Sequence, residues 1–400
     1  MTEETLLIQG YRFSAVAAGI KQPSTERLDF ALIVSDRPAI AAGVTTTNLV
    51  FAAPVEITRG RLGRGLCQAV LLNSGNANAC TGGRGLQDAL DLTRRVAEGL
   101  AIDSELVIPM STGVIGNPMP MDRIMGRIPE LIDRLDSQSF MDVAAAIMTT
   151  DTVPKTVRVH GTVKAGPFTI LGVAKGAGMM APNMATMLAV ILTDLRVELP
   201  FLQECLAEAV ARSFNAITID GDTSTNDTVL VMSGGHHNAL ELAENQSDRA
   251  IFSSSLNEAC EKLARQIVLD GEGATKLVEV KVCGAPDADS AAKVARTVAE
   301  SPLVKTAFHG EDPNWGRIIC SAGYSGVVFD PRRVDLFIGG VTILEDGMLA
   351  HGDWESAAHN VMKAREFSVL LDLKCGKGEA SFLTTDLSEE YVTINADYRS

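Results

Sequence analysis

The sequence has no apolar stretch long enough to cross a membrane and no export signal. Its longest apolar run covers residues 184–192, broken only by Thr186, far short of the about 20 residues that a spanning helix needs. The N-terminus, Met1-Thr-Glu-Glu-Thr, lacks the basic head and apolar segment of a signal peptide. These absences predict a cytoplasmic protein without a membrane partner.

Metal-binding patterns are missing as well. The six histidines form no H-x-x-x-H pair, and none stands at zinc spacing from a cysteine. The seven cysteines are scattered, odd in number and never in C-x-x-C spacing, which predicts reduced, mostly buried thiols. We therefore expect no metal site.

Basic residues are scarce relative to acidic ones. Thirty-five Lys and Arg stand against fifty Asp and Glu, a formal charge of −15. Such a surface repels phosphate backbones, so nucleic acid is not an expected partner. Four hundred residues with 46% hydrophobic content can bury a large core and predict two domains or one unusually large one.

Hydrophobic periodicity alternates between helix and strand along the chain, which predicts helices covering mixed sheets, an α+β (mixed α/β) class. Expected helices cover residues 85–100, 137–149, 200–214, 253–269 and 288–300. Expected strands cover residues 29–34, 68–73, 105–109, 228–232, 277–283, 335–338, 367–373 and 391–394.

A turn-rich loop lies just before the middle of the chain, between the strand-like residues 168–174 and the apolar run. Its glycines, Gly176 and Gly178, fit with Ala181 the dinucleotide spacing G-x-G-x-x-A. That fingerprint needs a helix opening at the glycines, whereas Pro182 and Asn183 interrupt the backbone there. A nucleotide-binding protein is therefore only one hypothesis, and a turn feeding a buried strand is the plain structural one.

The same loop supports a sharper hypothesis, a self-processing nucleophile. If the Oγ of Thr186 attacks the carbonyl of Ala185, the amide becomes an ester, and water then releases a new N-terminus. The freed α-amine, with a reference pKa of about 7.7–8.0, is suited to act as a base near neutral pH. Nucleophile and base would then sit on one residue.

Here the chain resembles a known family. The run Lys175-Gly-x-Gly-Met-x-x-Pro-x-Met-Ala-Thr-Met-Leu is similar to that of the ornithine acetyltransferases, also called glutamate N-acetyltransferases, of arginine biosynthesis. The resemblance extends over essentially the whole chain, through the C-terminal segment and six further motifs: Asn73-Ser-Gly-Asn-Ala-Asn, Ser111-Thr-Gly-Val-Ile-Gly, Thr149-Thr-Asp-Thr-x-Pro-Lys155, Asp220-Gly-Asp-Thr-Ser-Thr-Asn-Asp227, Asp270-Gly-Glu-Gly-Ala-Thr-Lys276 and Gly310-Glu-Asp-Pro-Asn-Trp-Gly-Arg317.

The resemblance implies a fold and a processed state. The expected fold is a four-layer helix–sheet–sheet–helix sandwich with mixed sheets. Cleavage between Ala185 and Thr186 would give an alpha chain of residues 1–185 and a beta chain of residues 186–400. The two chains are expected to remain together in a heterotetramer of two alpha and two beta chains.

The implied activity moves the acetyl group of N2-acetyl-L-ornithine to L-glutamate through an acetyl-threonine intermediate. No metal and no organic cofactor is required. Whether acetyl-CoA also serves as a donor, which would make the enzyme bifunctional, stays open. The alternative is an N-terminal-nucleophile amidase or aminopeptidase, because the same nucleophile hydrolyses its substrate if water replaces the accepting amine.

The resemblance also implies roles for individual residues. The side chain of Thr112 and the backbone N–H of Gly113 map onto the oxyanion hole; a glycine suits this role because no Cβ blocks its N–H. Thr186 maps onto the nucleophile. Substrate contacts map onto Thr149 (or its neighbour Thr150), Lys175, Thr186, Glu272, Asn395 and Ser400.

Local chemistry agrees with two of these roles. A lysine such as Lys175 can meet an α-carboxylate, and Glu272 suits an ornithine ammonium group. On local pattern alone, a lysine that snorkels to water is the default interpretation of Lys175. For Glu272, a solvated acidic turn and a functional side chain are about equally good interpretations. The motif at residues 73–78 stays unassigned, and the one at residues 310–317 is interpreted as structural.

Overall fold

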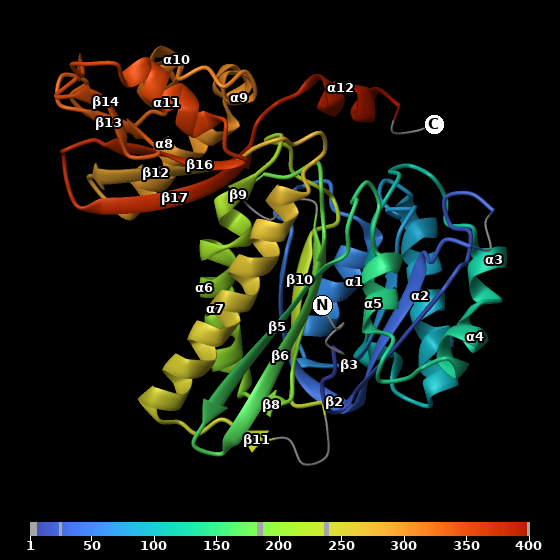
Figure 1. The fold of residues 1–400 in the computed structure, drawn as a ribbon. Coiled ribbons are helices and arrows are strands. Elements are labelled where there is room, and N and C mark those ends of the chain that lie inside the picture. Colours follow the sequence, from blue (N-terminus) through green and yellow to red (C-terminus); the bar gives the residue numbers. More distant parts are fainter. Residues whose placement is uncertain (1–5, 24–25, 182–186, 236–239, 398–400) are drawn as a thin grey trace. The chain divides into compact units, whose positions relative to one another are not determined.

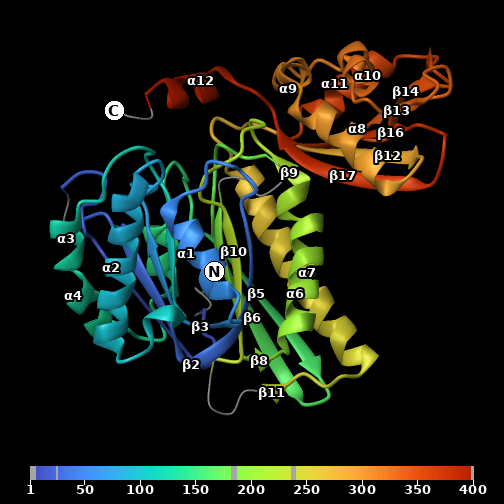
Figure 2. The ribbon, with the colours of Figure 1, turned by 180° about the vertical axis from the view of Figure 1, so that it is seen from behind.

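A computed structural model describes residues 6–23, 26–181, 187–235 and 240–397 (Figures 1 and 2). The chain forms two compact units. Unit 1 comprises residues 1–179, 183–215 and 222–267, and unit 2 comprises residues 180–182, 216–221 and 268–400. Each unit has its own sheet and core.

Unit 1 is built on an eight-stranded mixed sheet in the order β4-β3-β2-β10-β7-β6-β5, with β1 also paired to β2. β2 is long enough to pair with β1 and β3 over its first half and with β10 over its second. The strands are β1 (Tyr11–Val16), β2 (Phe30–Thr45), β3 (Leu66–Asn73), β4 (Val107–Ser111), β5 (Lys155–Val163), β6 (Gly166–Lys175), β7 (Leu188–Thr193) and β10 (Thr228–Ser233); β8 (Leu195–Arg196) and β11 (Leu240–Glu241) form a separate pair.

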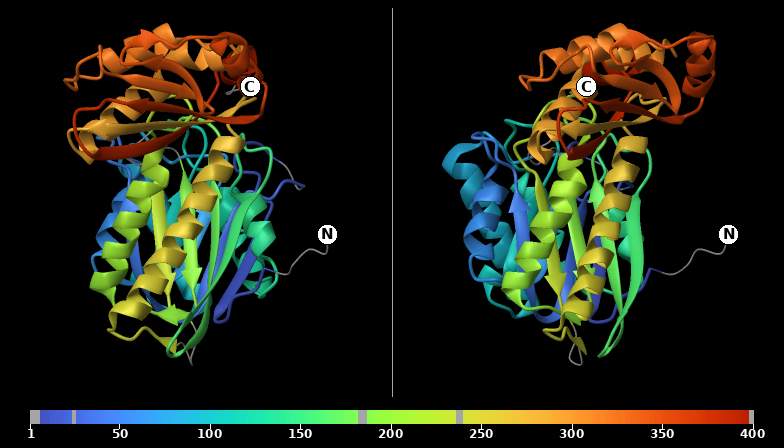
Figure 3. Two further views of the ribbon diagram at one scale, coloured as in Figure 1. Left: turned by 60° about the vertical axis from the view of Figure 1, so that its left-hand side comes forward. Right: turned by 90° about the vertical axis from the view of Figure 1, so that its left-hand side faces the viewer.

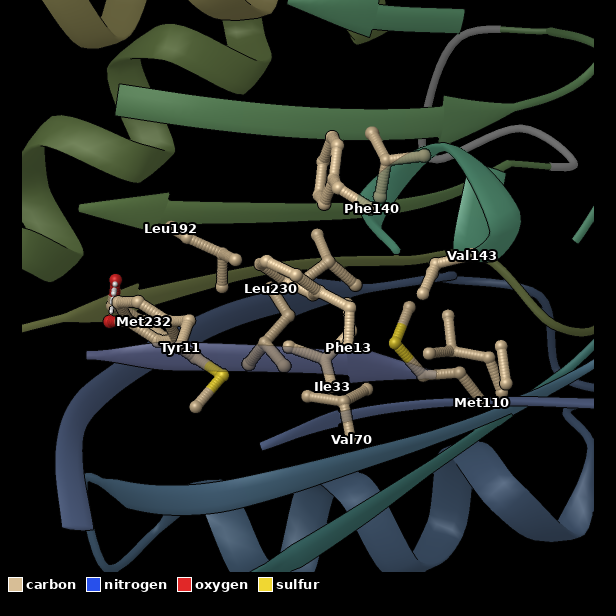
Figure 4. Close-up of a cluster of buried hydrophobic side chains, with 14 of the residues drawn as sticks. Tyr11, Phe13, Ile33, Val70, Met110, Phe140, Val143, Leu192, Leu230 and Met232 are labelled. Atoms are coloured by element: carbon tan, nitrogen blue, oxygen red, sulfur yellow. Dashed lines mark hydrogen bonds between the residues drawn. The ribbon is translucent and has the colours of Figure 1, made fainter. Parts of the chain in front are cut away.

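The main core of unit 1 is filled from both halves of this sheet. Figure 4 shows Phe13, Ile33 and Val70 of β1, β2 and β3 meeting Leu192 and Leu230 of β7 and β10. Every residue of β7 and of β10 is buried, which explains why both read as continuous apolar runs. Burying one such side chain stabilises the fold by about 1.5–3 kcal/mol.

Helices lie at opposite sides of unit 1 in both front and back views (Figures 1 and 2). A second core joins α2, α3 and α4 to strands β2, β3 and β4. Figure 3 shows α6 beside α7, and Gln266 of α7 exchanges hydrogen bonds with the backbone of Thr156 in β5. The helices are α1 (Ala53–Leu62), α2 (Gly82–Leu100), α3 (Met121–Met125), α4 (Ile128–Asp133), α5 (Phe140–Ala146), α6 (Leu199–Arg212) and α7 (Gln246–Leu269), whose last two residues belong to unit 2.

Unit 2 contains a seven-stranded mixed sheet in the order β15-β14-β13-β16-β12-β17-β9. Its core packs α8, α9, α10 and α11 against β12, β13, β14, β16 and β17. The strands are β9 (Ile217–Thr218), β12 (Leu277–Ala285), β13 (Asp335–Ile338), β14 (Val341–Glu345), β15 (Met348–Leu349), β16 (Glu366–Asp372) and β17 (Gly378–Thr385). The helices are α8 (Ala288–Glu300), α9 (Pro302–His309), α10 (Trp315–Gly323), α11 (Trp354–Met362) and α12 (Glu389–Ala396).

The predicted mixed α/β class with mixed sheets is confirmed, but one predicted element is wrong. Residues 391–394, expected as a strand, lie in helix α12. Ser388 caps this helix by accepting a hydrogen bond from Tyr391 N. Glu389 and Glu390 occupy its first turn, where their negative charges interact favourably with the positive end of the helix dipole.

Two smaller expectations also need correction. The helix expected at residues 137–149 covers only α5, because its flanks form turns. The thiols are not mostly buried: Cys80, Cys320 and Cys375 are exposed, although all seven cysteines are free. No helix among the described residues is long and apolar enough to span a membrane.

Candidate active site

The loop expected to hold the oxyanion begins where β4 ends. Because β3 and β4 run parallel with Asn73 opposite Ser111, the two strands end together. Ser111 Oγ donates to Asn73 Oδ1 at 2.6 Å, and Thr112 N donates to Asn73 O at 3.0 Å. The asparagine motif at residues 73–78, unassigned from sequence, therefore supports this loop.

Gly113 occupies a position that only glycine fits. Its φ is +131°, and an added Cβ would lie 2.5 Å from Asn76 N and closer still to the backbone of Gly75. Real Cβ atoms do not approach backbone atoms so closely. Any residue with a side chain at position 113 would therefore force this loop to shift.

Asn226 is a supporting residue that the sequence did not single out. Its Nδ2 donates to Ser111 O at 2.8 Å and to Ala77 O at 2.6 Å, and the residue is buried. It thereby joins the Thr112 loop to the asparagine motif. In the sequence, only its position in the Asp220–Asp227 motif pointed to Asn226, and the motif does not show which residues Asn226 contacts.

Lys175, at the end of β6, lies next to this loop. It is 2% exposed, and its Nζ donates to Thr112 Oγ1 at 3.4 Å, so the fold brings together two predicted residues that are 63 positions apart. An ammonium group beside the hydroxyl adds positive charge where an anion would develop.

A buried carboxylate, Asp151, connects the third predicted residue to this group. Asp151 Oδ2 accepts from Thr149 N at 2.9 Å, and Oδ1 accepts from Gly176 N and from Lys155 Nζ, each at 2.7 Å. Burial raises the pKa of Asp151, but the charges of Lys175 and Lys155 and these hydrogen bonds outweigh it and lower the pKa to about 2. Asp151 is therefore ionised at neutral pH.

Asp227 holds the start of β7. Its Oδ1 accepts from Met187 N at 2.9 Å, and Thr228 N donates to Met187 O at 3.1 Å. Burial raises the pKa of Asp227 well above its usual range, and the Met187 hydrogen bond and the Lys175 charge offset only part of this. The predicted cleavage residues, Ala185 and Thr186, lie outside the described residues.

In unit 2, Glu272 and Asn395 meet directly. Asn395 Nδ2 donates to Glu272 Oε2 at 2.8 Å, and Glu272 is 9% exposed. Gly273 permits this approach: its φ is +65°, and an added Cβ would lie 2.5 Å from Tyr391 N. Ser388 Oγ donates to Gly273 O at 2.6 Å and fixes the start of α12 on the same loop.

Asp386 anchors the segment that leads into α12. It accepts from Thr275 N at 2.8 Å, from Thr275 Oγ1 at 2.6 Å and from Lys276 N at 2.9 Å, and it lies 2.7 Å from His309 Nδ1. Burial raises its pKa, but the hydrogen bonds from Thr275 and His309 outweigh this and lower the pKa. The loop carrying Glu272 and the helix carrying Asn395 are thus tied together at both ends.

Three further predictions concern Ser400, metal binding and dinucleotide binding. Ser400 lies outside the described residues. No cluster of His, Cys, Asp and Glu able to hold a metal occurs among the residues that the structure describes. Across residues 176–181 no helix opens at the glycines, as a dinucleotide site would need.

Comparison with known proteins decides the family. The ArgJ family model matches residues 12–400. An arginine biosynthesis bifunctional protein ArgJ of Geobacter sulfurreducens is 50% identical, with 98% of this chain and 100% of the relative covered. The chain belongs to the ArgJ family. The predicted resemblance is therefore confirmed over essentially the whole chain.

Two solved structures match about half of this chain each. The arginine biosynthesis bifunctional protein of Bacillus halodurans is 41% identical, covering 51% of this chain and 95% of its own, with a TM-score of 0.48. The ornithine acetyltransferase of Mycobacterium tuberculosis, solved with ornithine, is 36% identical, covering 46% of this chain and 95% of its own, with a TM-score of 0.41.

Proposed function

We propose that the chain is a self-processing acetyltransferase that moves the acetyl group of N2-acetyl-L-ornithine to L-glutamate in arginine biosynthesis. Membership of the ArgJ family supports this activity. The observation that carries the mechanism is the contact of Lys175 with Thr112, at the end of the strand that leads toward Thr186.

In self-cleavage, Thr186 Oγ attacks the carbonyl carbon of Ala185, and the hydroxyl proton passes to the leaving nitrogen of Thr186. Water then hydrolyses the ester to the Ala185 carboxylate and restores the hydroxyl. The Thr112 hydroxyl and the Gly113 N–H stabilise the oxyanion in this step and in transfer.

In transfer, Thr186 Oγ attacks the acetyl carbonyl, and the Thr186 α-amine takes the hydroxyl proton and delivers it to the departing N2 of ornithine. The glutamate amine then attacks the acetyl-threonine ester and loses a proton as Oγ regains one. Lys175 binds the α-carboxylate that both amino acids share, and Thr149 contacts the polar groups next to it. Glu272 and Asn395, together with Ser400, contact the substrate side chain.

The finer features of the fold belong to the same proposal. One core filled from two halves of the unit 1 sheet, with helices at opposite sides, supports the four-layer arrangement. We assign residues 1–185 to an alpha chain and residues 186–400 to a beta chain, assembled as two of each in the cytoplasm.

Intact-mass spectrometry of the purified protein tests the cleavage. With 400 residues weighing 42.5 kDa, pieces of 185 and 215 residues weigh roughly 20 and 23 kDa. Thr186→Ala should leave the chain whole and inactive, because it removes the nucleophile of both reactions. A stable full-length chain that transfers acetyl groups would refute the mechanism.

Incubation with N-acetylornithine tests the reaction type. We expect N-acetylglutamate and ornithine to form in equal amounts when glutamate is present. Release of free acetate at a rate independent of glutamate would instead identify the amidase alternative.

A further inference from the structure

We propose that Asp151 and Lys155 form a buried positioning pair that sets the binding site for the α-carboxylate shared by both amino acids. The proposal deepens the proposed function and rests on it. Neither residue contacts substrate; both act through Thr149 and Lys175.

The geometry gives Asp151 three backbone and side-chain partners from three places in the chain. Its carboxylate takes the N–H of Thr149 after α5, the ammonium of Lys155 at the start of β5 and the N–H of Gly176 after β6. Gly176 follows Lys175 directly, so one carboxylate fixes the backbone at two predicted substrate residues. An ordinary ion pair between neighbouring positions 151 and 155 would not reach the end of another strand.

The charges show why the pair contains a lysine. Asp151 and Lys155 have side chains 0% and 1% exposed, where an unpaired charge is costly. Asp151 alone beside Lys175 would neutralise the charge that an incoming carboxylate needs. With Lys155 present, the group of two lysines and one carboxylate keeps a net charge of +1, which favours an anionic ligand.

The position of the pair makes the inference specific to binding. N-acetylornithine and glutamate share the α-carboxylate and differ in their side chains. Loss of the pair should therefore weaken both substrates by similar factors, whereas a defect at Glu272 should separate them. Self-cleavage binds no substrate carboxylate, so loss of the pair should affect it less than it affects the two KM values.

The test uses the full chain with Asp151→Asn, which keeps the size of the side chain but removes its charge. We expect KM for N-acetylornithine and for glutamate to rise together by about 10- to 100-fold, the loss expected when Lys175 no longer makes its charge-assisted contact with the α-carboxylate. The affinity for ornithine, measured calorimetrically without turnover, should fall by a similar factor. Glu258→Gln, which breaks the exposed pair with Lys262, is the matched control and should change neither value.

The double variant Asp151→Asn with Lys155→Met separates positioning from simple charge balance. It should recover much of the thermal stability lost in Asp151→Asn, because the Lys155 ammonium is no longer buried without its carboxylate partner, yet keep the raised KM values. Recovery of parental KM together with stability would overturn the proposal, as would unchanged ornithine affinity in either variant. A parent protein that binds ornithine but transfers no acetyl group would refute the proposed function alone.

Discussion

At the scale of single residues, Gly113 gives a direct test of the proposed oxyanion loop. Gly113→Ala places a Cβ against the backbone of Gly75 and Asn76, so the loop must shift. We expect the transfer rate to fall by about 10²–10³, the usual loss for one oxyanion donor. Gly116→Ala is the matched control, because φ is also positive there (+87°) but its Cβ meets open space. The readouts for both variants are kcat and the fraction of cleaved chain. Equal losses in the two variants would show that backbone strain alone explains the effect.

Glu272 tests how the two substrates are told apart. In Glu272→Gln an amide oxygen can still accept from Asn395, so only the charge is lost. If Glu272 receives the ornithine ammonium, the affinity for N-acetylornithine should weaken by about 1.5–3 kcal/mol while that for glutamate changes little. Steady-state KM values for both substrates measure this, and similar losses for both would contradict the role.

The site residues also show how far sequence reasoning reaches. Thr112, Thr149 and Lys175 were expected from the family resemblance, and the fold brings them together. Asp151 was not expected, because in sequence it looks like an ordinary acid after a helix. Its partner Gly176 lies 25 positions away, and only the pairing of β5 with β6 brings the two together.

At the scale of secondary structure, α12 shows where pattern reading fails. Tyr391, Val392, Thr393 and Ile394 are residues that favour strands, and their alternation suggested one. The decisive signals stand before them, in the cap Ser388 and two acids. In short segments a cap and tertiary contacts outweigh propensity, and here Asn395 reaches Glu272 only from a helix that places it above Tyr391.

The junction of α9 and β17 gives a pH prediction. Lys305 is 3% exposed, and its ammonium donates to Thr384 Oγ1 at 3.0 Å, to Thr385 Oγ1 at 2.9 Å and to Thr385 O. Burial lowers its pKa from 10.5 to about 7, although Asp386, Asp220 and Glu300 oppose the shift. Between these pH values the unfolded chain binds more protons than the folded one, so this residue makes folding more favourable as pH rises.

The measurement compares thermal unfolding of the parent with that of Lys305→Met from pH 7 to pH 10. As pH rises, the free energy of unfolding of the parent should increase relative to that of the variant by up to about 1.4 kcal/mol per pH unit. Below about pH 7 the difference between the two should stay constant. Lys281→Met, which alters a half-exposed lysine of the same unit, should follow the parent curve. A Lys305 variant whose curve runs parallel to the parent throughout would show that this ammonium titrates normally.

At the scale of the whole molecule, the proposed cleavage does not fall between the two compact units. It falls inside the sequence of unit 1, between β6 and β7. The sheet order places β7 and β10, from the proposed beta chain, between β6 and β2 of the alpha chain. β7 pairs antiparallel with β6, and β10 pairs antiparallel with β2. Backbone hydrogen bonds therefore join the two pieces along two strand pairs, β6–β7 and β2–β10, which we call the two seams.

The cleaved pieces should therefore behave as one folded body. Separating them requires breaking both seams and exposing the core that Leu192 and Leu230 share with Phe13 and Ile33, which amounts to unfolding unit 1. We expect the roughly 20 and 23 kDa pieces to elute together in size-exclusion chromatography, and to part only at the urea concentration where the circular dichroism of the sheet is lost. The uncleaved Thr186→Ala protein is the control and should lose its structure near the same concentration, because the seams, and not the peptide bond, hold the sheet. Pieces that separate while the sheet signal persists would mean that these strand pairings do not hold the two chains together.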